Sequence, residues 1–179
     1  MRMATGDNEL AERAAGGDRD AFRVLLERHY DRLYRLAYRF SGNHADAEDL
    51  AQDICLGLPA KLRSFRGEAK FTTWLYRIVV NAAQDLRRKQ MTASKAGETF
   101  AEVQDLTRAG EAQTASDMAW VYESLAAMSE DLHATALLVL AEGLSHAEAA
   151  EILDVKEGTI SWRMREIREQ LKTLLSETV

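Results

Sequence analysis

Apolar side chains recur every three or four residues through most of this sequence, and this spacing most limits what the chain can fold into. The stretch AFRVLLERHYDRLYRLAYRF, residues 21–40, is a clear example of one apolar helical face. Pro59 is the single proline among 179 residues, and Ala, Leu, Glu and Arg, which favour helices, are abundant. We therefore predict an all-α fold.

The first half of the chain is expected to form three helices around one core. The first begins at a cap from Asp18 or Asp20 and ends at Gly42. The second covers about residues 45–58, and Pro59 is expected to kink or end it because proline lacks the N–H that continues a helix. Its predicted core contacts are Leu50, Ile54, Leu56 and Leu58.

A third helix, WLYRIVVNAAQDLRRKQ, is predicted after the loop RSFRGEAKFTT, with Thr72 or Thr73 as its cap. Its predicted inward stripe consists of Leu75, Ile78, Val79, Ala82 and Leu86. The opposite side then carries Trp74, Arg77, Asn81, Gln84 and Arg88.

Acidic and basic residues are segregated along this half of the chain. The formal net charge of the whole chain is -6, which by itself argues against nucleic-acid binding. However, DAEDLAQD, residues 46–53, has four acids and no base, whereas residues 61–89 have eight bases and two acids. Two oppositely charged segments indicate two different partners.

The helical period is lost between residues 91 and 117, where the sequence becomes small, polar and acidic. Such a composition is typical of a flexible tether. We therefore predict a helical domain over residues 1–90, a flexible linker over 91–117 and a second helical domain over 118–179.

The second domain contains EGLSHAEAAEILDVKEGTISWRMREIREQL, residues 142–171, which predicts two helices with caps at Ser145 and Thr159. The small side chains of Ala149 and Ala150 allow the helices to cross closely, as a DNA-binding helix-turn-helix requires. Spacing alone also fits a plain helical hairpin with a solvated basic face.

The segment from DAEDLAQD through FRGEAKFTTWLYRIVVNAAQDLRRK, together with this C-terminal pair, resembles the extracytoplasmic-function (ECF) group of the sigma-70 family of bacterial sigma factors. The resemblance implies two helical domains joined by a flexible linker, the C-terminal one a helix-turn-helix. It implies a factor that binds core RNA polymerase, directs it to specific promoters and assists promoter opening. Such a factor uses no cofactor and is not an enzyme.

The resemblance also implies three binding sites. The polymerase-binding residues would be Asp46, Glu48, Asp49, Gln52 and Asp53. The residues for the promoter minus-ten element would be Phe65, Arg66, Gly67, Lys70, Thr73, Trp74, Arg77, Asn81 and Arg88. The residues for the minus-thirty-five element would be Lys156, Thr159, Ser161, Trp162, Arg163, Arg165 and Arg168.

The sequence does not decide two features of these residue sets. Trp74 is either a core residue or a platform on which an unstacked base lies. Ser161, Trp162 and Glu166 differ from the residues that the family often has at these positions, so the resemblance does not predict the promoter sequence.

The expected partners are core RNA polymerase, promoter DNA and an anti-sigma factor, the last implied by the resemblance. No apolar run is long enough for a signal peptide or a membrane span, so we expect a cytoplasmic protein without direct membrane insertion. A stand-alone helix-turn-helix regulator is the main alternative, but it would have no use for the acidic helix. A protein-binding adaptor would leave the basic segment unexplained.

Overall fold

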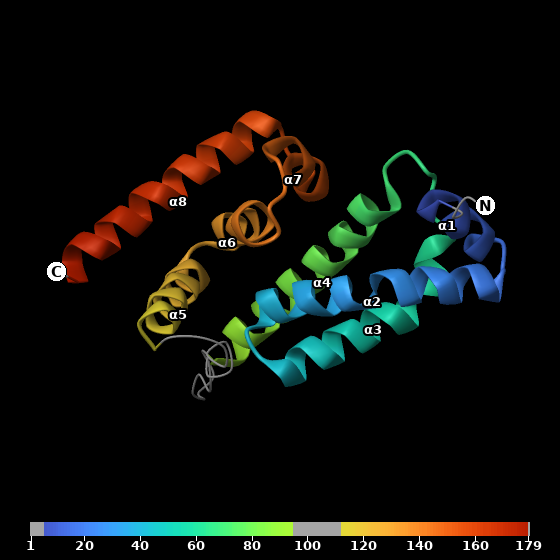
Figure 1. Cartoon of the computed structure of the whole chain (residues 1–179), viewed down its shortest axis with the longest axis horizontal. Helices are drawn as coiled ribbons and strands as arrows, with labels where there is room; N and C mark the ends of the chain where they lie inside the picture. The colour runs from blue at the N-terminus through green and yellow to red at the C-terminus, as the bar shows by residue number, and fades with distance from the viewer. Residues whose placement is uncertain (1–5, 95–111, 179) are drawn as a thin grey trace. The chain divides into compact units, whose positions relative to one another are not determined.

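The computed structural model describes residues 6–94 and 112–178, and every regular element within these ranges is a helix (Figure 1). The all-α prediction is therefore confirmed. The chain divides into two compact units, Met1–Met91 and Thr92–Val179, called unit 1 and unit 2 below. Within the described ranges, none of the helices combines the length and the apolar character needed to cross a membrane.

Unit 1 contains one helix more than the sequence predicted. The described helices are α1 (Asp7–Ala15), α2 (Arg19–Ser41), α3 (His44–Leu62) and α4 (Phe71–Ser94), which runs past the division between the units. The short helix α1 escaped prediction because it contributes only Leu10 and Ala11 to the core. Helices α2 and α3 lie side by side (Figure 1).

The ends of α2 agree with the sequence prediction. The Asp18 side chain caps the helix by accepting hydrogen bonds from the backbone N–H groups of Asp20 and Ala21. Gly42 closes it with a φ of 78°, in the left-handed region that glycine adopts without a steric penalty. Asn43 then caps α3, so the two helices are joined by a very short turn.

Helix α3 differs from the sequence prediction at Pro59 and Leu56. Pro59 is expected to kink or end the helix, and it does not end it, because the helix continues to Leu62. Burial of Leu58 and Leu62 on either side of the proline stabilises this last turn and offsets the lost backbone hydrogen bond. Leu56, predicted to lie in the core, is 81% exposed, while Leu50, Ile54 and Leu58 are buried as predicted.

Helix α4 begins at Phe71, so neither Thr72 nor Thr73 is its cap. The Phe71 backbone N–H instead donates to Oδ1 of Asn8 on α1, at 2.7 Å. The buried face is also wider than the predicted stripe, of which Leu75 and Val79 are buried and the other members are half-buried. Its buried residues are Phe71, Thr73, Leu75, Tyr76, Val79, Val80 and Ala83.

The predicted linker, residues 91–117, falls mostly on residues 95–111, which lie outside the described residues. Residues 91–94 at its start continue α4. Residues 112–117 at its end belong to α5 (Ala112–Ala127).

After α5, unit 2 continues with α6 (Glu130–Ala136), a π-helical turn η1 (Leu137–Ala141), α7 (His146–Leu153) and α8 (Glu157–Thr178). Its core is formed by aliphatic side chains from all of these elements. The largest fully buried ones are Leu137, Leu138, Ile160 and Ile167.

Helices α7 and α8 form the expected pair with a tight turn between them. Ser145 caps α7 and makes a reciprocal capping box with Glu148. Asp154 ends α7 in the left-handed region, with a φ of 53°. Thr159 is not the cap of α8, because the helix begins at Glu157 and the Thr159 N–H already donates to the Lys156 carbonyl oxygen, at 2.8 Å.

Candidate functional site

The exposed side of α3 combines acidic and amide groups with one large apolar side chain. Asp49, Gln52, Asp53 and Leu56 are all exposed, and steps of three and four residues place them on one face. The opposite side of the helix packs into unit 1 through Leu50, Ile54 and Leu58. We call these four exposed residues the α3 face.

Asp46 differs from the other predicted acids because its carboxylate is used inside unit 1. Its Oδ2 accepts hydrogen bonds from Nδ2 of Asn43, at 2.6 Å, and from Nε2 of Gln90, at 2.7 Å. Asp46 therefore links the start of α3 to α4.

Glu48 lies beside the α3 face, on the side nearer α2. Burial, and then the negative charge of Glu48, raise the pKa of Tyr34 on α2. Glu48 itself is exposed, so its carboxylate remains accessible.

An aromatic cluster supports the loop between α3 and α4. The ring of Phe65 lies 6.0 Å from that of Phe71 and 5.2 Å from that of Trp74, and the Phe71 and Trp74 rings are 5.8 Å apart. Phe71 is buried, whereas Phe65 and Trp74 are half-buried. Trp74 thus packs against core residues and still reaches the surface.

Basic and polar groups on this loop and on α4 are accessible. Arg66, Lys70, Asn81 and Arg88 are exposed and Arg77 is half-buried. Gly67 has a φ of 69°, which favours glycine at this point of the loop. Thr73 is only 8% exposed, so we remove it from the predicted DNA-binding set.

The outward side of α8 carries Ser161, Arg165 and Arg168, all exposed, and Lys156 is exposed just before the helix. Oγ of Ser161 lies 3.0 Å from Nδ1 of His146, which joins α8 to α7 near the turn. Arg165 and Arg168, three positions apart, place two cations on this side, which suit phosphate or base acceptors.

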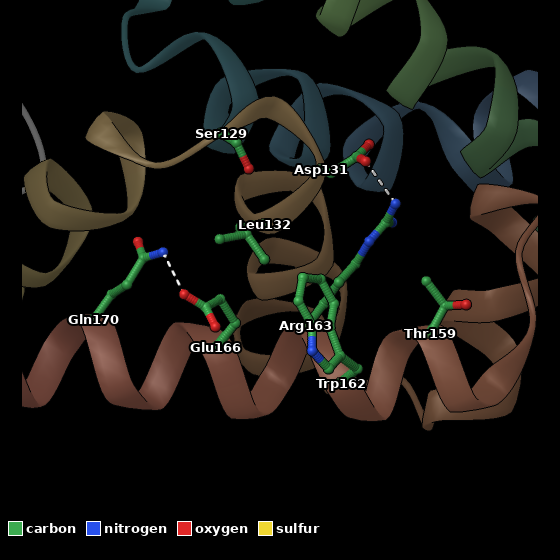
Figure 2. Close-up of a pocket in the computed structure, with 8 residues that line it drawn as sticks. All are labelled: Ser129, Asp131, Leu132, Thr159, Trp162, Arg163, Glu166 and Gln170. Atoms are coloured by element: carbon green, nitrogen blue, oxygen red, sulfur yellow. Dashed lines mark hydrogen bonds and ion pairs between the residues drawn. The ribbon is translucent and has the colours of Figure 1, made fainter.

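Arg163, one of the residues predicted for the minus-thirty-five element, points into unit 2 instead. It is 8% exposed, and its Nη2 donates to Oδ2 of Asp131 on α6, at 2.7 Å (Figure 2). A guanidinium committed to this ion pair fixes α8 against α6. We therefore remove Arg163 from the predicted DNA contacts.

Trp162 stands at the border between the outward side of α8 and a hollow of about 460 Å³ between α6 and α8 (Figure 2). Its side chain is 60% exposed. Thr159 is half-buried and lines the same hollow. The remaining lining residues are Ser129, Asp131, Leu132, Arg163, Glu166 and Gln170.

Sequence reasoning missed two residues that bear on these sites. Leu56 carried a usable signal, since its three- and four-residue distances from Asp53 and Gln52 place it on their face. Asn8 carried none, because its partners are the Ala69 carbonyl oxygen and the Phe71 N–H, far along the chain.

A model of Sigma-70 region 2 matches residues 25–92 of this chain, which include α3, the following loop and most of α4. The chain is also similar along nearly its whole length to the ECF RNA polymerase sigma factor SigM of Mycobacterium tuberculosis (strain ATCC 25618 / H37Rv). The two are 37% identical over 175 residues, which are 97% of this chain and 87% of the relative. The ECF RNA polymerase sigma-E factor of Escherichia coli (strain K12) is 30% identical over 176 residues, with 92% of each chain covered.

Two solved structures each resemble most of this chain. One is CnrH in complex with the cytosolic domain of CnrY, with a TM-score of 0.71, 26% identity and coverage of 97% of this chain and 99% of that one. The other is the sigma factor RpoE in complex with the anti-sigma factor NepR from Bartonella quintana. Its TM-score is 0.69 at 27% identity, with 87% of this chain and 96% of that chain covered.

Proposed function

Because this chain belongs to the extracytoplasmic-function group of the sigma-70 family, and is therefore a transcription initiation factor and not an enzyme, we propose that its two units divide promoter recognition between them. Unit 1 binds core RNA polymerase and opens the minus-ten element. Unit 2 reads the minus-thirty-five element as duplex DNA. The α3 face carries this proposal, since it combines exposed charge with an exposed apolar group.

The α3 face is the proposed docking surface for core polymerase. Leu56, which follows Gln52 and Asp53 on α3, is 81% exposed and contributes nothing to the core of unit 1. Desolvation of such an apolar group inside a polar rim is the usual source of interface affinity, and the carboxylates add orientation and a faster association rate.

Charge reversal tests this assignment. Asp49→Lys combined with Asp53→Lys is expected to weaken binding to purified core polymerase at least tenfold, because two favourable charge contacts become repulsive. Circular dichroism should report an unchanged fold, since both residues are exposed. Affinity is measured by titration of labelled protein at physiological salt.

A matched control is available on α2. Glu27 and Asp31 are also exposed acids four residues apart in unit 1, so Glu27→Lys combined with Asp31→Lys makes the same change in charge elsewhere. This control should keep near-parent affinity. Equal losses of affinity in the two double variants would show that the effect comes from net charge alone. Parent affinity in the Asp49/Asp53 variant would contradict the docking assignment.

For the minus-ten element we assign the loop and α4 to the non-template single strand. Arg66, Lys70 and Arg88 supply cations for phosphates, and the half-buried rings of Phe65 and Trp74 offer faces on which unstacked bases lie. Asn81 is exposed and can read a base edge. Asn81→Ala is expected to reduce permanganate reactivity of the opened promoter more than it reduces duplex binding.

On unit 2, the α8 side defined by Ser161, Arg165 and Arg168 is proposed to enter the major groove, with Lys156 on the backbone phosphates. Trp162 lies at the edge of this surface, where an indole can pack on a sugar or a thymine methyl group. Thr159 lines the hollow between α6 and α8, so we assign it a supporting role.

The solved relatives also suggest control by a protein partner, because RpoE is bound there to the anti-sigma factor NepR. We assign this chain an anti-sigma factor as well, and a cytoplasmic location, where polymerase and DNA are found. An inhibitor co-expressed with this chain should block its binding to core polymerase. If this chain captures as much core polymerase in the presence of the inhibitor as in its absence, the assignment is contradicted.

A further inference from the structure

We propose that Asn8 on α1 is a positioning residue for promoter opening, which holds the α3–α4 loop where it receives the non-template strand. The inference rests on the proposed minus-ten function of this loop. Asn8 brackets Lys70, because its carboxamide binds the residues on both sides. Nδ2 donates to the Ala69 carbonyl oxygen at 3.1 Å, and Oδ1 accepts from the Phe71 N–H at 2.7 Å.

This second hydrogen bond replaces the missing cap of α4. The first N–H groups of a helix have no partner within the helix, and the side chain of the preceding residue usually provides one. Lys70 precedes α4 and has no acceptor in its side chain. The Asn8 carboxamide supplies the acceptor from another helix, and it leaves the Lys70 ammonium exposed.

Side-chain contacts attach α1 (Figure 1) to α2, so α1 can serve as the reference for the loop. Asp7 Oδ2 lies 2.9 Å from Nε2 of the buried His29, and Asp7 Oδ1 accepts from Arg28 Nη1, also at 2.9 Å. On α1 itself, the side chains of Leu10 and Ala11 are buried.

The loop approaches α1 at a second point. A Cβ added to Gly67 would lie 3.3 Å from Oε1 of Glu12, closer than an ordinary contact. Helix α1 thus approaches the loop near Gly67 and binds it at Ala69 and Phe71, so its contacts flank the exposed residues Glu68 and Lys70. A loop that is already ordered loses less conformational entropy when single-stranded DNA binds. Loss of this attachment should therefore weaken DNA binding specifically.

The test uses holoenzyme assembled from core polymerase and the full chain. Its probe is a fluorescent oligonucleotide with the non-template minus-ten sequence of a promoter recovered by run-off transcription from a genomic fragment pool. Asn8→Ala removes both hydrogen bonds. Asn8→Asp keeps an acceptor for the Phe71 N–H but places a second oxygen against the Ala69 carbonyl oxygen. Both variants should bind the oligonucleotide roughly tenfold more weakly, as expected from losing one or two hydrogen bonds, with core affinity unchanged.

Two controls separate the outcomes. Asn43→Ala removes the cap of α3 in the same unit and should lower thermal stability without weakening oligonucleotide binding. Equal weakening by Asn43→Ala, or parent binding by both Asn8 variants, would overturn the inference. Lys70→Ala tests the loop itself. If Lys70→Ala weakens binding while the Asn8 variants do not, only the positioning role of Asn8 fails; if Lys70→Ala binds like the parent, the proposed minus-ten function fails with it.

Discussion

Helices α3 and α8 both present charged side chains to solvent, but they do so in different ways. The α3 face is acidic and contains an exposed leucine, whereas the outward side of α8 carries Arg165 and Arg168 and has Trp162 at its border. In each helix one charged residue expected to contact a partner turns inward. Asp46 binds Asn43 and Gln90, and Arg163 binds Asp131.

The comparison teaches that the sign of a charged segment indicates its class of partner, while the helical position of each residue decides whether it is available. Asp46 and Arg163 belong to the correct segments by charge. Both lie beside the buried stripe of their helix, where internal partners within hydrogen-bonding distance compete with external ones. Residue availability therefore requires the packing of the unit to be known.

The largest expected effect separates two of the leucines of α3, Leu56 and Leu58. Leu58→Ala should lower the free energy of unfolding of unit 1 by about 2–5 kcal/mol, because it leaves a cavity where the side chain is now 2% exposed. Leu56→Ala should leave stability nearly unchanged and weaken core polymerase binding instead. Urea titrations and core-binding assays on both variants measure this contrast. Equal destabilisation would contradict the assignment of Leu56 to the surface.

On α8 the matched pair is Arg163 and Arg165. Arg165→Ala should relax the preference at one position of the minus-thirty-five element, by about 1–3 kcal/mol between bases. Arg163→Ala should lower the thermal stability of unit 2 and leave the order of preferred sequences unchanged. Selection from a randomised promoter library reports the preference. A changed preference in Arg163→Ala at full stability would restore this residue to the DNA surface.

A smaller effect is expected from Asp46. Asp46→Ala removes two hydrogen bonds to side chains and should cost about 1 kcal/mol of unit 1 stability. Core affinity should fall less than in Asp49→Ala, since the Asp46 carboxylate already has internal partners. Thermal denaturation and core titration together check this order, and the reverse order of affinities would place Asp46 in the docking surface.

The smallest effect belongs to Arg168. If this residue holds phosphate, Arg168→Ala should weaken all promoters by a similar factor and reduce the slope of log affinity against log salt by about one. Measurements at several salt concentrations on two unrelated promoters test this. A loss confined to one promoter would identify Arg168 as a base-reading residue.

The sequence was sufficient for the parts of the fold that local patterns determine. The helical period indicated α2, α3, α4 and α8, and side-chain caps at Asp18 and Ser145 were correct because a cap acts within a few residues. The continuation of α3 through Pro59 could not be predicted in this way. It depends on the burial of Leu62 against the rest of unit 1, a tertiary contact.

The candidate sites were predictable as segments but not as individual residues. The acidic run and the arginines of α8 were visible in the sequence, and Leu56 could have been placed by its helical position. The inward turn of Arg163 required the location of Asp131, which lies 32 residues earlier on another helix. The same holds for Asn8, whose partners lie 61 and 63 residues away.

Run-off transcription tests the division of function between the units most directly. Core polymerase would be combined with the parent, with Leu56→Ala or with Arg165→Ala on one pool of genomic fragments, and the transcripts sequenced. The account predicts that Leu56→Ala, at limiting concentration, lowers all transcripts in parallel and that Arg165→Ala changes their relative abundance. A changed transcript set with Leu56→Ala, or a parallel loss with Arg165→Ala, would contradict it.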